Sequence, residues 1–290
     1  MMRIANLSGR SVLVVPGQQL GEVGVIDVAR RSGGRFGPDP QALYGDWAAF
    51  RAWADGADRT PDRILCPGPA FGPPVPDPRQ IFAVGLNYGE RSSEAGAPDD
   101  AIPPVFTKFP TSLAGAFATV ELPTDTVDWE VELVLVLGTD AYRITEDRVA
   151  DVVAGAMVGQ DLTDRASQFV RPWPQFGLSK SYPGFAPTGP WLSTLDELGA
   201  LDDLTLSCRI DGELMQRDST ASMRVGATRL IAELSQRVRL TAGDLVFTGS
   251  PGGVGHYRTP PRYLRPGNRL ESEITGLGTQ LVTLIPTTAL

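Results

Sequence analysis

The sequence has few residues of the kinds that build disulfide frameworks or zinc sites. It holds one histidine and two cysteines in 290 residues. Cys66 and Cys208 lie far apart and outside any Cys-x-x-Cys pattern, so neither a disulfide framework nor a zinc site is indicated. A free cysteine usually behaves as a small apolar residue, and we therefore expect both thiols to be buried.

Excess positive charge and long apolar runs are also missing. The net charge is −8, which argues against a nucleic-acid or anionic-membrane partner, since both need a basic surface. No apolar run approaches the roughly 18 residues of a membrane span. The first residues also lack the apolar core of a signal peptide. We expect a cytoplasmic protein whose partner is a small molecule.

Glycine and proline are plentiful, with 32 and 25 residues. They predict many turns, short strands and ordered loops rather than a helical bundle. Six prolines between Leu65 and Pro78 exclude a regular helix or central strand there. We therefore predict a small N-terminal accessory domain over residues 1–64, a Pro-rich linker over 65–78 and a catalytic domain over 79–290.

Hydrophobic patterning favours strands in both parts of the chain. Asp211 and Gly212 predict a hairpin with a type I′ turn. Helical periodicity appears at 40–55, 145–153 and 223–238. The sum is a β-rich α+β fold. The predicted strands are Arg3–Leu7, Ser11–Val15, Glu22–Asp27, Ile81–Gly85, Val105–Lys108, Val131–Gly138, Val153–Gln160, Leu204–Ile210, Leu245–Gly249, Arg269–Ile274 and Gln280–Ile285.

One predicted strand begins with two glutamates in a buried setting. The strand period of two places Glu130 and Glu132 on one face and Val131 and Leu133 on the other. Two carboxylates in one confined space would be costly unless a cation neutralises them. The alternative is that both glutamates lie on a solvated face or pair with Arg and Lys.

A third carboxylate strengthens the metal hypothesis. Asp161 ends the second long apolar run, at a strand end where ligands are commonly placed. Three carboxylates without His or Cys suit Mg²⁺ or Mn²⁺, with Ca²⁺ as a further option. Glu130, Glu132 and Asp161 are therefore the predicted metal ligands.

Six segments, in the same order and spacing over residues 76–286, closely resemble the fumarylacetoacetate hydrolase (FAH) family. The first residues also resemble the accessory domain of many bacterial members. The segments that carry the family resemblance are Val84–Tyr88, Phe106–Leu113, Asp128–Leu133, Gln160–Arg165, Phe185–Trp191 and Gly243–Gly255.

This resemblance implies a mixed β-sandwich roll, a homodimer and a divalent metal held by the same three carboxylates. It also implies that Tyr88, Gln168, Lys180 and Ser250 contact substrate. Ser250 stands where the family usually has threonine, and Ser179 where it usually has glycine.

The resemblance breaks where family members that cleave carbon–carbon bonds or decarboxylate usually carry a histidine and a glutamate. Here Arg91 replaces that histidine while Glu94 persists. Arginine is no general base at neutral pH, although its guanidinium could bind a substrate carboxylate. Glu94, Lys180 and Arg91 are the catalytic candidates. His256, the sole histidine, is interpreted as a surface-loop residue.

These features predict a metal-dependent enzyme acting on a small 2-oxo acid or 1,3-dicarbonyl compound through a metal-stabilised enolate, as a carbon–carbon hydrolase of the acylpyruvase type. Arg91 keeps an isomerase or tautomerase, a decarboxylase, a hydratase and a cyclase of secondary metabolism open as alternatives. A catalytically silent metal-binding relative is a further alternative.

Overall fold

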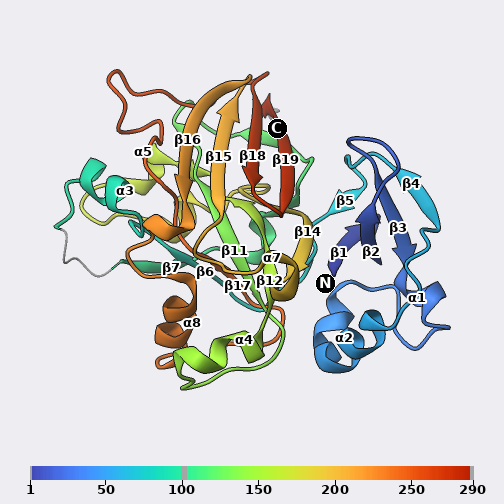
Figure 1. Ribbon diagram of the computed structural model, residues 1–290. Coiled ribbons are helices and arrows are strands. Elements are labelled where there is room, and N and C mark those ends of the chain that lie inside the picture. The colour runs from blue at the N-terminus through green and yellow to red at the C-terminus, as the bar shows by residue number, and fades with distance from the viewer. Residues whose placement is uncertain (1, 99–102, 288–290) are drawn as a thin grey trace.

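The computed structural model describes residues 2–98 and 103–287 of the chain. Its elements are mainly strands, arranged in two sheets and a short two-stranded ribbon, with short helices at the periphery (Figure 1). The predicted β-rich α+β class is confirmed. Within these residues, no helix combines the length and the apolar character that crossing a bilayer requires.

The larger sheet runs through the whole molecule and contains twelve strands in the described part of the chain. Two of them lie off the main path, β5 (Phe71–Gly72) beside β1 and β8 (Leu113–Gly115) beside β14. The others follow, in spatial order, as β4 (Arg63–Leu65), β3 (Val23–Asp27), β2 (Arg10–Pro16), β1 (Arg3–Leu7), β14 (Ala186–Thr194), β12 (Val153–Gln160), β11 (Val131–Leu137), β17 (Leu245–Phe247), β6 (Ile81–Val84) and β7 (Val105–Thr107).

A five-stranded sheet covers one face of the larger sheet. Its strand β15 contacts β11, and its strands β18 and β19 contact β12. The ribbon pairs β10 (Val127–Asp128) with β13 (Thr163–Asp164). In spatial order the five strands are β16 (Glu213–Ser219), β15 (Thr205–Ile210), β18 (Arg269–Ile274), β19 (Gly278–Pro286) and β9 (Thr119–Leu122).

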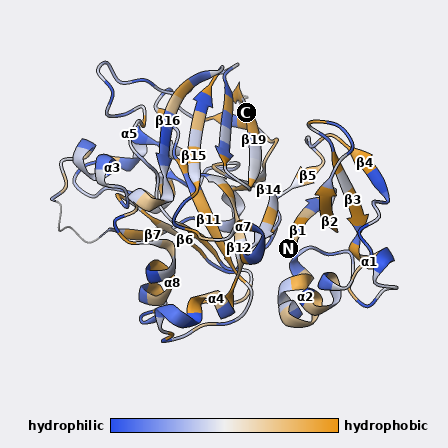
Figure 2. Cartoon of the chain, in the orientation of Figure 1, coloured by the Kyte–Doolittle hydropathy of each residue, from blue (hydrophilic) through white to orange (hydrophobic). Residues whose placement is uncertain are grey.

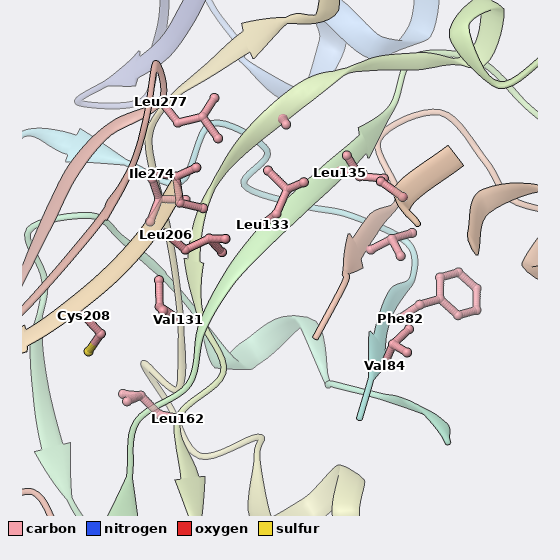
Figure 3. Packing of buried hydrophobic residues seen from close by; sticks show 14 of the residues in the cluster. Phe82, Val84, Val131, Leu133, Leu135, Leu162, Leu206, Cys208, Ile274 and Leu277 are labelled. Atoms are coloured by element: carbon pink, nitrogen blue, oxygen red, sulfur yellow. The ribbon is translucent and has the colours of Figure 1, made fainter. Parts of the chain in front are cut away.

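The main hydrophobic core lies between these two sheets. Val131, Leu133 and Leu135 of β11 point toward Leu206 and Ile274 of the facing sheet (Figure 3). All five are fully buried. The opposite face of β11 is apolar too, because Val134 and Val136 belong to a second core cluster. A strand buried on both faces reads as a continuous apolar run, as this one does.

The N-terminal strands lie to one side of the molecule but join the larger sheet (Figure 1). Strand β1 pairs antiparallel with β14, with Arg3 opposite Ser193 and Ile4 opposite Leu192. The second core cluster also combines N-terminal residues such as Ile4 and Phe50 with Val134 of β11. The division into an accessory domain, a linker and a catalytic domain stays a prediction.

The helices are short and peripheral. Helix α3, beside the site described below, is hydrophilic, whereas strands such as β6 are largely apolar (Figure 2). The helical segments are α1 (Val28–Arg31), η1 (Gln41–Asp46), α2 (Trp47–Asp55), α3 (Gly89–Glu94), η2 (Pro110–Ser112), η3 (Glu146–Arg148), α4 (Val149–Val152), α5 (Arg165–Gln168), α6 (Phe176–Ser179), α7 (Leu195–Leu198), η4 (Thr220–Ser222) and α8 (Ala227–Ser235).

The structure confirms the predicted secondary structure where the sequence carries a clear turn signal or hydrophobic period. The predicted hairpin is present, with φ of 51° at Asp211 and 85° at Gly212, as a type I′ turn requires. The helix expected over 223–238 is confined to Ala227–Ser235. Strand β14 was missed because Pro187 and Pro190 interrupt its pattern, and proline is rare inside sheets.

The expectation of two buried thiols holds for only one of them. Cys208 lies in the core between the sheets, whereas Cys66 is exposed. Cys66 follows β4, the last strand in the order of the larger sheet, whereas Cys208 belongs to the core between the two sheets. Both are free cysteines.

The core between the two sheets makes Leu133 important for stability. Replacing Leu133 by Ala removes buried apolar surface and leaves a cavity, so we expect a loss of about 2 to 5 kcal/mol in the free energy of unfolding. Urea titration followed by circular dichroism measures this loss. Leu20→Ala is the matched control, because Leu20 is fully exposed and should change stability by less than about 0.5 kcal/mol. Equal effects of the two substitutions would contradict this core assignment.

Candidate active site

Three carboxylates meet where β11 begins and β12 ends. The two strands are antiparallel, with Val131 opposite Gln160, so Glu130 and Asp161 become neighbours. The Asp161 N–H donates to the Glu130 carbonyl at 2.9 Å. One carboxylate oxygen from each of Glu130, Glu132 and Asp161 lies within 4.8 Å of the others, and all three side chains are buried. The structure therefore brings the predicted triad together.

Two lysines enter the same space. The Lys180 Nζ lies 2.8 Å from Glu130 Oε2 and 2.5 Å from Asp161 Oδ2. The Lys108 Nζ lies 2.7 Å from Asp161 Oδ1 and also donates to the Lys180 carbonyl. Each lysine is only 2% exposed. Both oxygens of Asp161 thus have a lysine partner.

An arginine completes the neutralisation of Glu130. Arg165 donates through Nη2 to Glu130 Oε1 at 2.6 Å and through Nε to Asp128 Oδ2 at 2.8 Å. Burial disfavours the charged carboxylate of Glu130, but Lys180, Arg165 and Arg91 outweigh that effect and lower its pKa. Burial alone would lower the pKa of Lys180, but the negative charges of Asp161 and Glu130 outweigh this effect and raise it. Glu130 and Lys180 are therefore both charged at neutral pH.

Glu132 stands apart from these ion pairs. Its Oε2 accepts the Gly249 N–H at 2.8 Å, from a backbone with φ of 103° that favours glycine. No lysine or arginine of the described residues forms an ion pair with it. Burial, together with the charges of Asp161 and Glu130, raises the pKa of Glu132 well above its ordinary value.

The donor set fits a divalent cation. Three carboxylates supply only hard oxygen ligands, which Mg²⁺, Mn²⁺ and Ca²⁺ prefer. A cation beside Glu132 would provide the ion-pair partner that this carboxylate lacks among the described residues. Glu130, Glu132 and Asp161 are the residues that would hold it, and the identity of the metal stays a prediction.

A cavity of about 210 Å³ has Glu130 in its wall. Its apolar wall includes Val84, Leu86, Phe106, Phe169 and Phe176. The polar side chains that line it are Arg91, Glu130, Gln168, Lys180, Ser250 and Tyr257. Four predicted substrate or catalytic residues, Arg91, Gln168, Lys180 and Ser250, therefore share one pocket with a predicted metal ligand.

The candidates Tyr88 and Glu94 do not line this cavity, and neither do the metal-ligand candidates Glu132 and Asp161 or the sole histidine, His256. Tyr88 is fully buried in the main core, and its hydroxyl has no hydrogen-bond partner among the described residues. The Glu94 Oε1 accepts the Gly253 N–H at 2.7 Å, and burial raises the pKa of Glu94. His256 stacks on Phe169, with ring centroids 5.0 Å apart, and its Nδ1 lies 3.0 Å from the Tyr263 hydroxyl. The functional roles of Tyr88 and Glu94 stay predictions, and His256, interpreted from the sequence as a surface-loop residue, is partly buried.

Sequence reasoning missed the buried residues that hold the site in place. Gln160 accepts the Glu130 N–H at 2.9 Å, and Gln216 accepts the Val131 N–H at 3.0 Å. Gln216 also donates to the Ser250 hydroxyl at 2.8 Å. Arg165 Nη1 donates to Gln168 Oε1 at 2.8 Å. The one sequence signal for Arg165 is its position four residues after Asp161, which places a positive charge close to a predicted metal ligand.

Comparisons with known proteins agree with this picture. The family model described as fumarylacetoacetate (FAA) hydrolase C-terminal matches residues 80–285. The chain is 37% identical over 210 residues to oxaloacetate tautomerase FAHD2B, mitochondrial, of Bos taurus, covering 72% of this chain and 67% of the relative. It is 37% identical over 232 residues to 2,4-didehydro-3-deoxy-L-rhamnonate hydrolase of Sphingomonas sp. (strain SKA58), covering 79% of this chain and 81% of that one.

Two solved structures share the whole fold. One, from Mycobacterium smegmatis and assigned as an HpcE protein, has a TM-score of 0.91 and 46% identity, covering 99% of this chain and 100% of its own. The other, from Mycobacterium abscessus and assigned as a 2-hydroxyhepta-2,4-diene-1,7-dioate isomerase, has a TM-score of 0.83 and 30% identity, covering 99% of each chain.

The contacts of Arg165 predict a large effect on stability. Arg165→Met leaves the buried carboxylates of Asp128 and Glu130 without their shared partner, so we expect a loss of about 3 to 5 kcal/mol in the free energy of unfolding. Chemical denaturation measures it. Arg237→Met is the control, because Arg237 pairs with Glu233 on the exposed face of a helix and should change stability by less than about 1 kcal/mol. A small effect of Arg165→Met would contradict the assignment of Arg165 as the shared partner of Asp128 and Glu130.

Proposed function

Because this chain belongs to the fumarylacetoacetate hydrolase family, we propose that it is a divalent-metal-dependent enzyme that forms an enolate from a small 2-oxo acid or 1,3-dicarbonyl compound. One observation carries the proposal: Glu130, one member of the buried acidic triad, lines a small cavity that Lys180, Gln168 and Ser250 also line. A triad placed only for structural reasons would not need an opening lined by three further polar groups. The size of the cavity suits a small acid.

The residues around the cavity have separable tasks. A divalent cation held by Glu130, Glu132 and Asp161 would supply a Lewis acid that offsets negative charge developing on a substrate oxygen. Lys180 presents a positive charge to a substrate oxygen or carboxylate. Gln168, fixed by Arg165, and Ser250, fixed by Gln216, orient the substrate by hydrogen bonds. The apolar wall excludes water from the reacting centre.

Of the reactions that share an enolate, we favour keto–enol tautomerisation or a related isomerisation, because it activates no water molecule and needs only a group that takes a proton from carbon and returns it, for which Glu94 is the candidate. Arg91 lines the cavity where the family usually has histidine, and a guanidinium does not take up a proton at neutral pH. Relatives named as an oxaloacetate tautomerase and a dioate isomerase support this assignment. Carbon–carbon hydrolysis is the second candidate, because Glu94 persists and its Oε2 has no partner in the described part of the chain.

The homodimer, the cytoplasmic location and the accessory role of residues 1–64 are further proposals. They follow from the family resemblance and from the composition of the chain. The metal dependence and the reaction are the parts that can be tested directly.

Metal binding can be measured without a substrate. We expect wild-type protein to bind one Mn²⁺ per chain in calorimetric titration, and Mn²⁺ at about 100 times its Kd to stabilise the fold by about 2.7 kcal/mol. Glu132→Gln removes a charged ligand and should weaken binding at least about 10-fold. Glu121→Gln is the control, because Glu121 is an exposed residue of strand β9, and it should leave the Kd for Mn²⁺ unchanged. Unchanged binding in Glu132→Gln would remove the metal site from the proposal.

Turnover is tested with oxaloacetate and acetylpyruvate, following ultraviolet loss of the enol and analysing the products. Mg²⁺, Mn²⁺ and EDTA are compared, with metal alone as a blank. We expect metal-dependent interconversion of enol and keto oxaloacetate without cleavage, which EDTA abolishes. Cleavage of acetylpyruvate by wild type would favour the hydrolase candidate. Cleavage only in Arg91→His would assign the loss of hydrolysis to Arg91, and retained metal without any turnover would identify a catalytically silent relative.

A further inference from the structure

We propose that Arg91 is a specificity-determining residue that binds a second carboxylate of the substrate, so that this site selects a short 2-oxo dicarboxylate over the matching monocarboxylate. The inference rests on the proposed function, because it names the substrate class of the same cavity. Its starting point is that Arg91 lines the cavity although its side chain is only 6% exposed.

The guanidinium of Arg91 is buried with unused donors. Its Nη1 has no hydrogen-bond partner among the described residues. Its Nη2 lies 3.7 Å from Glu130 Oε1, beyond hydrogen-bond distance. Both oxygens of Glu130 already accept hydrogen bonds from Arg165 and Lys180, so Arg91 acts on Glu130 only through its charge. A buried cation without an anion at hydrogen-bond distance is costly, and an incoming carboxylate would reduce that cost.

The guanidinium also packs against an aromatic ring at the cavity wall. Its Cζ lies 4.7 Å from the ring centroid of Tyr257, which lines the same cavity. Glu94, on the same helix α3, makes no ion pair with it within the described residues and instead accepts the Gly253 N–H. A planar fork with free donors matches a carboxylate bidentately.

The charges around the cavity favour a dianion. With Glu132 ionised, as it would be when holding a metal, the triad, the cations paired with it and the Asp128 partner of Arg165 comprise four positive and four negative groups. A divalent cation would add two positive charges that a dianionic substrate balances. Asp164 lies outside this set, because hydroxyl and backbone groups satisfy its carboxylate. The eight groups are Arg91, Lys108, Arg165, Lys180, Asp128, Glu130, Glu132 and Asp161.

The size of the cavity limits the length of that dianion. At about 210 Å³ it is smaller than the roughly 300 to 1,000 Å³ pockets that take drug-sized ligands. Phe106, Phe169 and Phe176 close it with an apolar wall. A short carbon chain between two carboxylates therefore fits this cavity better than a long or branched one.

The test compares two ligands that differ only by the second carboxylate. Malate and 2-hydroxybutanoate share the 2-hydroxy acid unit, and malate carries a carboxylate where 2-hydroxybutanoate carries a methyl group. In calorimetric titrations with Mg²⁺ present, we expect wild type to bind malate about 10- to 100-fold more tightly. Arg91→Gln should abolish that preference, and Arg91→Lys, which keeps the charge but not the fork, should retain part of it.

Arg262→Gln is the matched control, because Arg262 is partly exposed and pairs with Glu213 outside the cavity. It should keep the full preference for malate. Thermal unfolding of each variant verifies that it folds, and the Arg91→Lys variant carries the test if Arg91→Gln is unstable. A wild type without preference, or an Arg91→Gln variant that keeps it, would overturn the proposal.

The outcome is independent of turnover, because neither ligand has to react. If wild type prefers malate through Arg91 but turns over no oxo acid, the proposed function fails while the role of Arg91 stands. If oxo acids are turned over but the preference is absent or insensitive to Arg91, the reverse holds. With turnover, the same substitution should raise KM for oxaloacetate about 10- to 100-fold and leave KM for 2-oxobutanoate within a factor of about 3.

Discussion

Several buried charges crowd the joined ends of β11 and β12, and the rest of the site depends on how they are compensated. Three carboxylates within 4.8 Å of one another cannot all remain charged in a dry environment without cations. Lys108, Lys180 and Arg165 compensate Asp161 and Glu130. Glu132 is left without such a partner, which is why the arrangement fits a divalent cation.

The two-layer fold holds these charged side chains in fixed relative positions. Because both faces of β11 are buried, its backbone cannot shift without disturbing two cores. Side chains from the facing sheet add to this, since Gln216 joins the Val131 N–H to the Ser250 hydroxyl. In a water-excluded site, hydrogen bonds and ion pairs of this kind are stronger than at the surface. Burial between the two sheets therefore both fixes the position of β11 and strengthens the ion pairs at its end.

The same principle explains why Arg91 stands out. Every other cation of the cluster has an anion within hydrogen-bond distance, whereas Arg91 is buried with free donors. Family membership, confirmed by the match over residues 80–285, says which fold and which general chemistry to expect. The resemblance places a histidine where this chain has Arg91, and we propose that the exchange replaces a proton carrier with an anion-binding group.

The sequence by itself determined the β-rich class, the family, most strands and the three carboxylates, because a buried strand and its end residues leave a local pattern with period two. It could not predict β14, whose prolines break that pattern. Only the tertiary structure decided that Lys108 and Gln216 converge on the triad, since they come from segments distant from it in the sequence, and that the nearby Asp128 and Arg165 pair with each other beside it. It also decided that Arg91 faces the cavity and Tyr88 the core, because side-chain direction on a short loop and helix is set by packing rather than by sequence.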